Sequence, residues 1–178
     1  MPTAVLVIDV QQGLCEGDSA AYDCAGTIAR INVVTDRARH AGVPVIFIQH
    51  ESDSGYLEYG SAAWQLANGL QSHATDLRVR KRTPDSFLRT PLAELLEQHG
   101  ITDLVICGMH SEFCVDTTTR RALALGYPVR LVADGHTSAG NATLHPTQVI
   151  AHHTATLANI QSFGPRVTPI SHDQLAFS

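Results

Sequence analysis

The stretch AVLVID at residues 4–9 decides the fold, because five apolar residues run without a break and end on a carboxylate. Consecutive apolar residues are typical of a strand that helices cover on both faces, as in parallel sheets. Similar short runs recur along the chain with helix-like stretches between them, which is the pattern of repeated βαβ units. The sequence therefore predicts a three-layer α/β/α fold whose central sheet is doubly wound and mostly parallel.

The remaining elements follow from the same patterns. Strands are expected at Ala4–Asp9, Val43–Gln49, Leu77–Arg80, Asp103–Cys107, Val129–Ala133 and Val167–Ile170. Helices are expected at Cys24–Ala41, Pro91–His99, Phe113–Leu125 and Pro146–Ile160, with prolines near two starts and glycines just past three ends. The segment from His50 to His73 has no clear periodicity and is expected to be a long, site-building loop. No linker or repeat divides the chain, so residues 1–178 are expected to form a single domain.

The composition excludes several classes of partner. The chain carries 12 Lys and Arg against 17 Asp and Glu and has no basic run, so it is not expected to bind nucleic acid or a membrane. No apolar run approaches the roughly 18 residues of a membrane helix. The N-terminus lacks the basic segment of a secretory signal, so we expect a cytoplasmic protein with a small-molecule substrate. Charged residues make up 16% of the chain, against about 25% in an average domain, which favours a homo-oligomer, a dimer or higher.

Three reactive side chains fall at one edge of the predicted sheet. In an open parallel sheet, ligands bind beyond the carboxyl ends of the strands. Asp9 ends the first predicted strand, Lys81 follows the third, and Cys114 follows the bend that leaves the fourth. A carboxylate, an ammonium and a thiol at one place predict acyl transfer, with Cys114 as nucleophile, Asp9 as base and Lys81 as the partner of the thiolate.

We expect the pKa of the Cys114 thiol to be lowered. Cys114 falls in the first turn of a predicted helix, where free backbone amides and the positive end of the dipole stabilise a thiolate. A nearby Lys81 ammonium would lower the pKa further. The bend from Gly108 to Ser111 can direct backbone amides at one point, and such donors stabilise an oxyanion.

Each of these residues also has a purely structural interpretation that the sequence leaves open. A single Asp at a strand end is often a turn or helix cap, and Lys81 lies in a basic triplet that fits a solvated surface spot. Cys114 taken alone fits a small buried apolar residue. The coincidence of all three at one sheet edge favours the catalytic interpretation.

A thiol redox or sensor protein is the rival from another functional class. Such a protein usually needs a resolving cysteine close to the reactive one. Cys107 lies inside a predicted strand and is expected to be a core residue, while Cys15 and Cys24 form no apparent chemical constellation. All four cysteines are expected to be free thiols.

Longer segments around these residues resemble a known family. They are AVLVIDVQQ at residues 4–12, KRTPDSF at 81–87 followed by TPL at 90–92, and CGMHSEFCVDT at 107–117, with the run from Ala122 to Asp134 continuing the pattern. Together they resemble the isochorismatase-like cysteine hydrolases, the superfamily of isochorismatase, nicotinamidase and N-carbamoylsarcosine amidase. The resemblance covers nearly the whole chain and implies the Rossmann-like α/β fold of that family.

The resemblance implies a catalytic triad of Asp9, Lys81 and Cys114 that cleaves a C–N amide-type bond through a thioester. It also implies a cis peptide bond at Met109-His110 and an oxyanion hole made by the backbone amides of His110 and Cys114. Isochorismatases proper lack the nucleophilic cysteine, so the presence of Cys114 argues against cleavage of an enol-ether bond. No cofactor is implied.

A metal-assisted, nicotinamidase-like amidase is the alternative within the family. Nicotinamidases bind a metal through an Asp and two His that follow the second strand. Here that region reads QHESDSG at residues 49–55, which does not reproduce the set. His50, Glu51 and Asp53 offer ligand types that suit zinc or manganese, but neighbouring loop residues rarely converge on one ion. We therefore expect an enzyme without a metal.

Gln11, Trp64, Phe87 and Phe113 are the expected substrate-pocket residues. The stretch GSAAWQ at residues 60–65 resembles a substrate-loop segment of family members, where Trp64 would pack on a flat or apolar substrate. Anchoring of the long loop, or a subunit contact, is the equally open alternative for this tryptophan. Phe113 stands next to the nucleophile and faces either the pocket or a neighbouring subunit.

Overall fold

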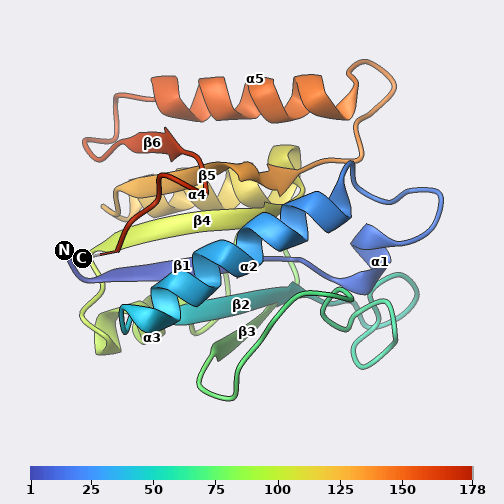
Figure 1. The fold of residues 1–178 in the computed structure, drawn as a ribbon, viewed down its shortest axis with the longest axis horizontal. Coiled ribbons are helices and arrows are strands. Elements are labelled where there is room, and N and C mark those ends of the chain that lie inside the picture. The colour runs from blue at the N-terminus through green and yellow to red at the C-terminus, as the bar shows by residue number, and fades with distance from the viewer. Residues whose placement is uncertain (178) are drawn as a thin grey trace.

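The computed structural model describes residues 1–177, and its six strands form one sheet in which all neighbours run parallel (Figure 1). The strand order is β3-β2-β1-β4-β5-β6. The strands are β1 (Thr3–Ile8), β2 (Val45–His50), β3 (Leu77–Lys81), β4 (Asp103–Met109), β5 (Val129–Thr137) and β6 (Val167–Ile170). The helices are α1 (Gln12–Cys15), α2 (Cys24–His40), α3 (Leu92–Gln98), the π-helix η1 (Ser111–Val115), α4 (Asp116–Ala124) and α5 (Pro146–Asn159). The predicted doubly wound α/β fold is confirmed.

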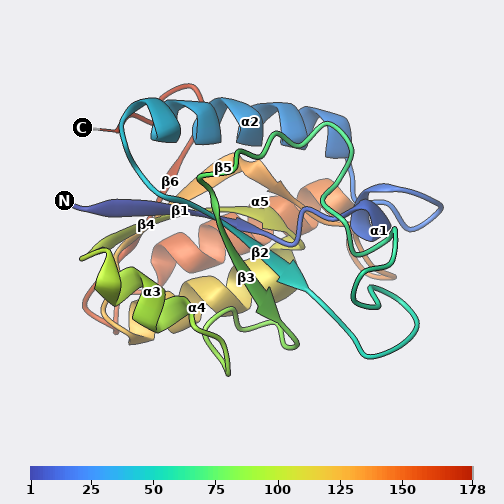
Figure 2. The same ribbon diagram turned by 90° about the horizontal axis from the view of Figure 1, so that it is seen from below.

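Helices cover both faces of the sheet. Figure 2 shows α2 on one face and α3, α4 and α5 on the other. Successive side chains of β1 therefore have different partners: Val5 and Val7 join Ile31 of α2, whereas Leu6 joins Leu96 of α3. This burial on two sides explains why the strand is apolar at consecutive positions. Within residues 1–177, no helix has both the length and the apolar character needed to cross a membrane.

The carboxyl edge of the sheet forms one end of the molecule. β1 lies between β2 and β4, so the chain leaves the centre of the sheet toward opposite sides, which creates the switch point where open sheets bind ligands. At this end Figure 1 shows α1 and the long loop between β2 and β3, and both chain termini lie at the other end. The irregular segment expected from the sequence is this loop.

The observed elements differ from the predicted ones near the carboxyl edge. The helix expected at residues 113–125 begins earlier, as the π-helical turn η1, because the N–H groups of Phe113 and Val115 both donate to the His110 carbonyl (3.1 and 3.2 Å). β5 extends to Thr137, beyond a shift in its register with β4. The single-turn helix α1 was not expected, and its first residue has no side-chain cap.

Gly108 of β4 generates a prediction about stability. Its φ is +123°, and a Cβ atom there would collide with the backbone of Ile8 in β1. Gly126 also has a positive φ, +95°, but a Cβ atom would meet nothing within 4 Å. We expect Gly108→Ala to lower the free energy of unfolding by more than ~3 kcal/mol. The control Gly126→Ala should cost about 1–2 kcal/mol, from backbone strain alone. If urea denaturation showed that both variants lose the same free energy of unfolding, this close approach of β1 and β4 would be contradicted.

Candidate active site

The side chains of Asp9, Lys81 and Cys114 meet at the carboxyl edge of the sheet. Lys81 Nζ lies 2.8 Å from Asp9 Oδ2 and 3.1 Å from Cys114 Sγ. All three residues are closed off from solvent, with exposed fractions of 1%, 2% and 8% for Asp9, Lys81 and Cys114. The structure thus brings together the three residues that the sequence places at strand ends.

The ends of three strands position these side chains. Asp9 directly follows β1, and its backbone N–H donates to the Ile48 carbonyl of β2 (2.8 Å). Its φ of +52° turns the chain out of the strand at this point. Lys81 is the last residue of β3, and Cys114 lies in η1 just beyond β4. The parallel arrangement therefore gathers residues from distant parts of the sequence at one edge.

The buried ammonium of Lys81 is held in its charged form by its neighbours. Burial alone would lower its pKa, but the Asp9 carboxylate and the Cys114 sulfur outweigh that effect and raise the pKa above its usual value. Lys81 Nζ also lies 3.1 Å from the Thr83 carbonyl oxygen, to which it donates. Lys81 is thus a permanent cation of the site and has no role as a proton acceptor at neutral pH.

The expectation of a lowered pKa for Cys114 is wrong. Burial raises the pKa of the thiol to about 12, and the negative charge of Asp9 adds to this rise, while Lys81 acts in the opposite direction. The expectation took the helix start and the lysine into account but not the enclosure of the sulfur or the carboxylate beside it. The resting site therefore contains a neutral thiol next to an ionised pair.

Asp9 offers a free acceptor atom next to this thiol. Its Oδ2 accepts from Lys81, whereas its Oδ1 is buried without a hydrogen-bond partner among the described residues. One side-chain ligand atom from each of Asp9, His50 and Cys114 lies within 4.8 Å of the other two. A carboxylate at this distance from a neutral thiol can take up its proton when the sulfur attacks a substrate.

His50 also lies in this centre, where the sequence analysis did not predict it. Its Nδ1 lies 3.2 Å from Lys81 Nζ. Burial lowers its pKa, and the Lys81 charge lowers it further, so the ring is neutral at pH 7. The signal was available in the sequence, because His50 ends β2 just as Asp9 and Lys81 stand at the ends of β1 and β3.

The metal-ligand set His50, Glu51 and Asp53 is not brought together. The Glu51 carboxylate faces Arg80 and Arg82, at 3.6 and 3.5 Å, and Asp53 pairs with Arg82 at 2.7 Å. The set that does converge is Asp9, His50 and Cys114. Lys81 Nζ lies among these donors, however, so a metal ion here would have to displace the ammonium. Asp9, His50 and Cys114 therefore fit the Lys81 ammonium as their cation better than a bound metal ion.

The bend after β4 has the backbone form that the family resemblance implies. The peptide bond between Met109 and His110 is cis. His110 is followed directly by η1, which carries Cys114. The amides of His110 and Cys114 therefore belong to one short segment beside the thiol.

Two of the expected pocket residues have structural roles. Gln11 is fully buried, and its side-chain amide is saturated: Oε1 accepts from His50 N–H (2.9 Å), and Nε2 donates to the carbonyls of His50 (2.9 Å) and Trp64 (2.8 Å). Phe87 packs in the core and stacks on Tyr127, with ring centres 6.3 Å apart. These contacts give both residues a structural role, and their place in the substrate pocket stays a prediction.

The other two expected pocket residues lie where they can meet a ligand. Phe113 is 57% exposed and lines a cavity of about 560 Å³ together with Tyr56, His110 and Glu112. Trp64 is half-buried in the long loop and packs edge-on against Tyr59, with ring centres 4.9 Å apart. That Trp64 lines the substrate pocket stays a prediction.

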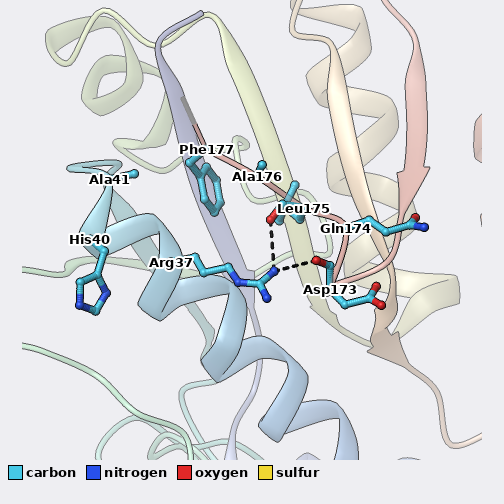
Figure 3. A pocket seen from close by; sticks show the side chains of 8 residues that line it. All are labelled: Arg37, His40, Ala41, Asp173, Gln174, Leu175, Ala176 and Phe177. Carbon is cyan, nitrogen blue, oxygen red and sulfur yellow. Dashed lines mark hydrogen bonds between the residues drawn. The ribbon is translucent and has the colours of Figure 1, made fainter.

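A second cavity lies away from the chemistry. It measures about 510 Å³ and is bounded by the C-terminal end of α2 and by residues 173–177 (Figure 3). Arg37 Nη1 fastens the C-terminal segment there by donating to the carbonyls of Asp173 (3.0 Å) and Leu175 (3.3 Å). Because α2 leads into the start of β2, this cavity faces the amino edge of the sheet.

Cys107 lies on the other face of the sheet from Cys114. Cys107 packs in the cluster beneath α2, whereas Cys114 packs with the helices on the opposite face of the sheet. Cys107 is completely buried, as expected for a core residue, and Cys15 and Cys24 are half-buried free thiols. This separation across the sheet disfavours the thiol sensor alternative.

The charges around Cys114 predict opposite effects of two substitutions. Asp9→Asn should lower the pKa of the thiol, because a nearby negative charge is removed, and Lys81→Met should raise it, because a positive charge is removed. At pH 8, iodoacetamide should therefore label Cys114 faster in D9N and more slowly in K81M than in the wild type, as followed by peptide mass spectrometry. Asp53→Asn, in the exposed loop, is the control and should leave the rate unchanged. Shifts in the same direction for D9N and K81M would refute the electrostatic description.

Comparison with known proteins assigns the chain to a family. Residues 3–167 match the profile of the isochorismatase domain. A streptothricin hydrolase of Streptomyces noursei is 35% identical over 75% of this chain and 53% of its own length. A ureidoacrylate amidohydrolase, RutB, of Methylobacterium radiotolerans is 29% identical over 90% of this chain and 74% of its own length.

The fold is likewise shared with solved structures. The crystal structure of an isochorismatase family protein matches with a TM-score of 0.87 and 34% identity, covering 96% of this chain and 98% of that one. The chain spans about half the length of the two streptothricin hydrolases it matches, 53% and 49%. The profile match covers β1 to β5 and ends at Val167, the first residue of β6, and by this match the chain belongs to the isochorismatase family.

Proposed function

We propose that the chain is a cysteine hydrolase that cleaves a C–N amide-type bond of a small molecule through a thioester on Cys114. The observation that carries this proposal is the contact of Lys81 Nζ with both Asp9 Oδ2 (2.8 Å) and Cys114 Sγ (3.1 Å) in a buried site. The names of the streptothricin hydrolase and the ureidoacrylate amidohydrolase support the same class of reaction.

In the first half-reaction, Asp9 takes the proton of the Cys114 thiol as the sulfur attacks the substrate carbonyl. Because the pKa of the thiol is raised to about 12, the thiolate forms during the attack and does not exist in the resting site. The Lys81 ammonium stabilises the negative sulfur, and the backbone amides of His110 and Cys114 hold the oxyanion. The leaving amine or ammonia then receives the proton from Asp9.

In the second half-reaction, water hydrolyses the thioester. Asp9, which is a carboxylate again, accepts a proton from the water as it attacks the acyl carbon. Collapse of the second oxyanion intermediate releases the acid, and the sulfur leaves with a proton from Asp9. Covalent catalysis divides one difficult displacement into two easier ones.

The covalent mechanism predicts that Cys114 is indispensable. Cys114→Ala and Cys114→Ser should each lower kcat by a factor on the order of 10³ or more, because no other side chain replaces the nucleophile. Release of amine or ammonia from streptothricin and ureidoacrylate is the measurement, and circular dichroism checks the fold. Cys24→Ala, a half-buried thiol outside the site, is the matched control and should retain activity. Hydrolysis by C114A at the wild-type rate would exclude the thioester.

Independence from metal is a second expected property. Lys81 Nζ lies among the donor atoms that a metal would need, and the raised pKa of its ammonium keeps it charged. Dialysis against EDTA and 1,10-phenanthroline should therefore leave kcat unchanged, with total metal followed by elemental analysis. Loss of activity that zinc or manganese restores, together with hydrolysis of nicotinamide, would support the metal-assisted alternative instead.

A further inference from the structure

His50 belongs to the catalytic centre, yet the proposed reaction uses none of its atoms. Its Nδ1 lies 3.2 Å from Lys81 Nζ, and a ring nitrogen lies within 4.8 Å of donor atoms of both Asp9 and Cys114. Its Nε2 has no hydrogen-bond partner among residues 1–177 and is not one of the polar atoms sealed in the interior. A polar atom that is open at a reaction centre is available to a substrate.

The neighbours of His50 determine which ring nitrogen carries the proton. Lys81 is an ammonium and can only donate, so its contact with Nδ1 favours the tautomer in which Nδ1 accepts and carries no hydrogen. The charged and titratable groups that face the ring are Lys81 from β3, Asp9 after β1, Cys114 of η1 and the adjacent Glu51. Burial and the Lys81 charge favour the neutral ring. The single ring proton therefore resides on Nε2.

The backbone of His50 is also fixed. Gln11 accepts from the N–H of His50 and donates to its carbonyl, both at 2.9 Å. Gln11 thereby clamps the last residue of β2 from both sides, in addition to the sheet hydrogen bonds. The Nε2–H group is a donor whose position and direction are set before a substrate binds, which is the property that makes a polar contact effective.

The strand order places this donor opposite the oxyanion amides. β2 and β4 lie on different sides of β1, and the amides of His110 and Cys114 follow β4. His50 therefore approaches the Cys114 sulfur from a different strand than the segment that carries the two amides.

We infer that His50 is a substrate-binding residue whose Nε2–H donates to an acceptor atom of the substrate close to the scissile bond. The substrate is then an amide with a second acceptor, an oxygen or an unprotonated nitrogen, close to the bond that is cleaved. Ureido compounds and amides flanked by a carbonyl or ether oxygen have this chemistry. The inference rests on the proposed cysteine hydrolase function.

Two substitutions of His50 distinguish a role in substrate binding from a role that consists only of the contact with Lys81. The side-chain amide of Gln reaches the place of Nε2, whereas that of Asn reaches only the place of Nδ1, next to Lys81. We expect His50→Gln to keep kcat/KM for ureidoacrylate or streptothricin within a few-fold of the wild type. His50→Asn should lower it about tenfold, the value of one neutral hydrogen bond to a substrate.

Iodoacetamide labelling of Cys114 should stay at the wild-type rate in both variants, because Asp9 and Lys81 remain. The inference would be overturned if H50N kept the wild-type kcat/KM and H50Q did not, or if kcat/KM were equal in both variants and the wild type. Loss of labelling in H50N would also overturn it, since the residue would then act through Lys81.

The tautomer of His50 provides a test that needs no substrate. Long-range ¹H–¹⁵N correlation spectra at pH 7 should show a neutral ring with the proton on Nε2, assigned by its absence from the H50Q spectrum. A proton on Nδ1, or a charged ring, would overturn the inference even if the variants are active. Hydrolysis by C114A, in contrast, would refute the proposed function itself, and normal kinetics of H50N beside an inactive C114A would refute only the role of His50.

Discussion

The ion pair of Lys81 and Asp9 is the interaction on which the site depends. Its two charges lie 2.8 Å apart with exposed fractions of only 2% and 1%, so neither is solvated by water. Such a pair contributes little net stability, because desolvation of both charges offsets their attraction, but removal of one partner leaves an uncompensated buried charge. The placement of this pair beside Cys114 is therefore a feature of function more than of folding.

The register of the sheet is what assembles the pair. His50 and Lys81 are direct neighbours across β2 and β3, and Ile8 and Ile48 are neighbours across β1 and β2. Asp9 and Gln49, the residues just beyond Ile8 and Ile48, thus lie one position before the level of His50 and Lys81. A shift of one position in either ladder would turn the polar side chain to the other face of the sheet and separate the charges. The same register therefore determines both how the strands pack in the interior and where the polar side chains of the site lie.

Sequence patterns predicted the strands and the meeting of Asp9, Lys81 and Cys114 at one edge of the sheet, because both depend on where apolar runs end. They failed where the outcome depends on three-dimensional distances. The thiol pKa depends on enclosure and on the carboxylate beside the sulfur, and neither is visible in the order of residues. For Gln11, which was expected in the substrate pocket, the structure adds hydrogen bonds of its side-chain amide to the backbone of His50 and Trp64.

The raised thiol pKa favours one order of events in the proposed reaction. A thiolate formed in advance would be a buried charge beside Asp9, which the raised pKa of the thiol disfavours. A neutral thiol beside a free carboxylate oxygen instead couples the loss of the proton to the attack, and the proton collected on Asp9 is then available for the leaving amine. Lys81, which keeps its charge throughout, stabilises the negative sulfur only while it exists. In the proposed mechanism, the same burial that makes the cysteine look inert at rest therefore couples the proton transfer to the formation of the carbon–sulfur bond.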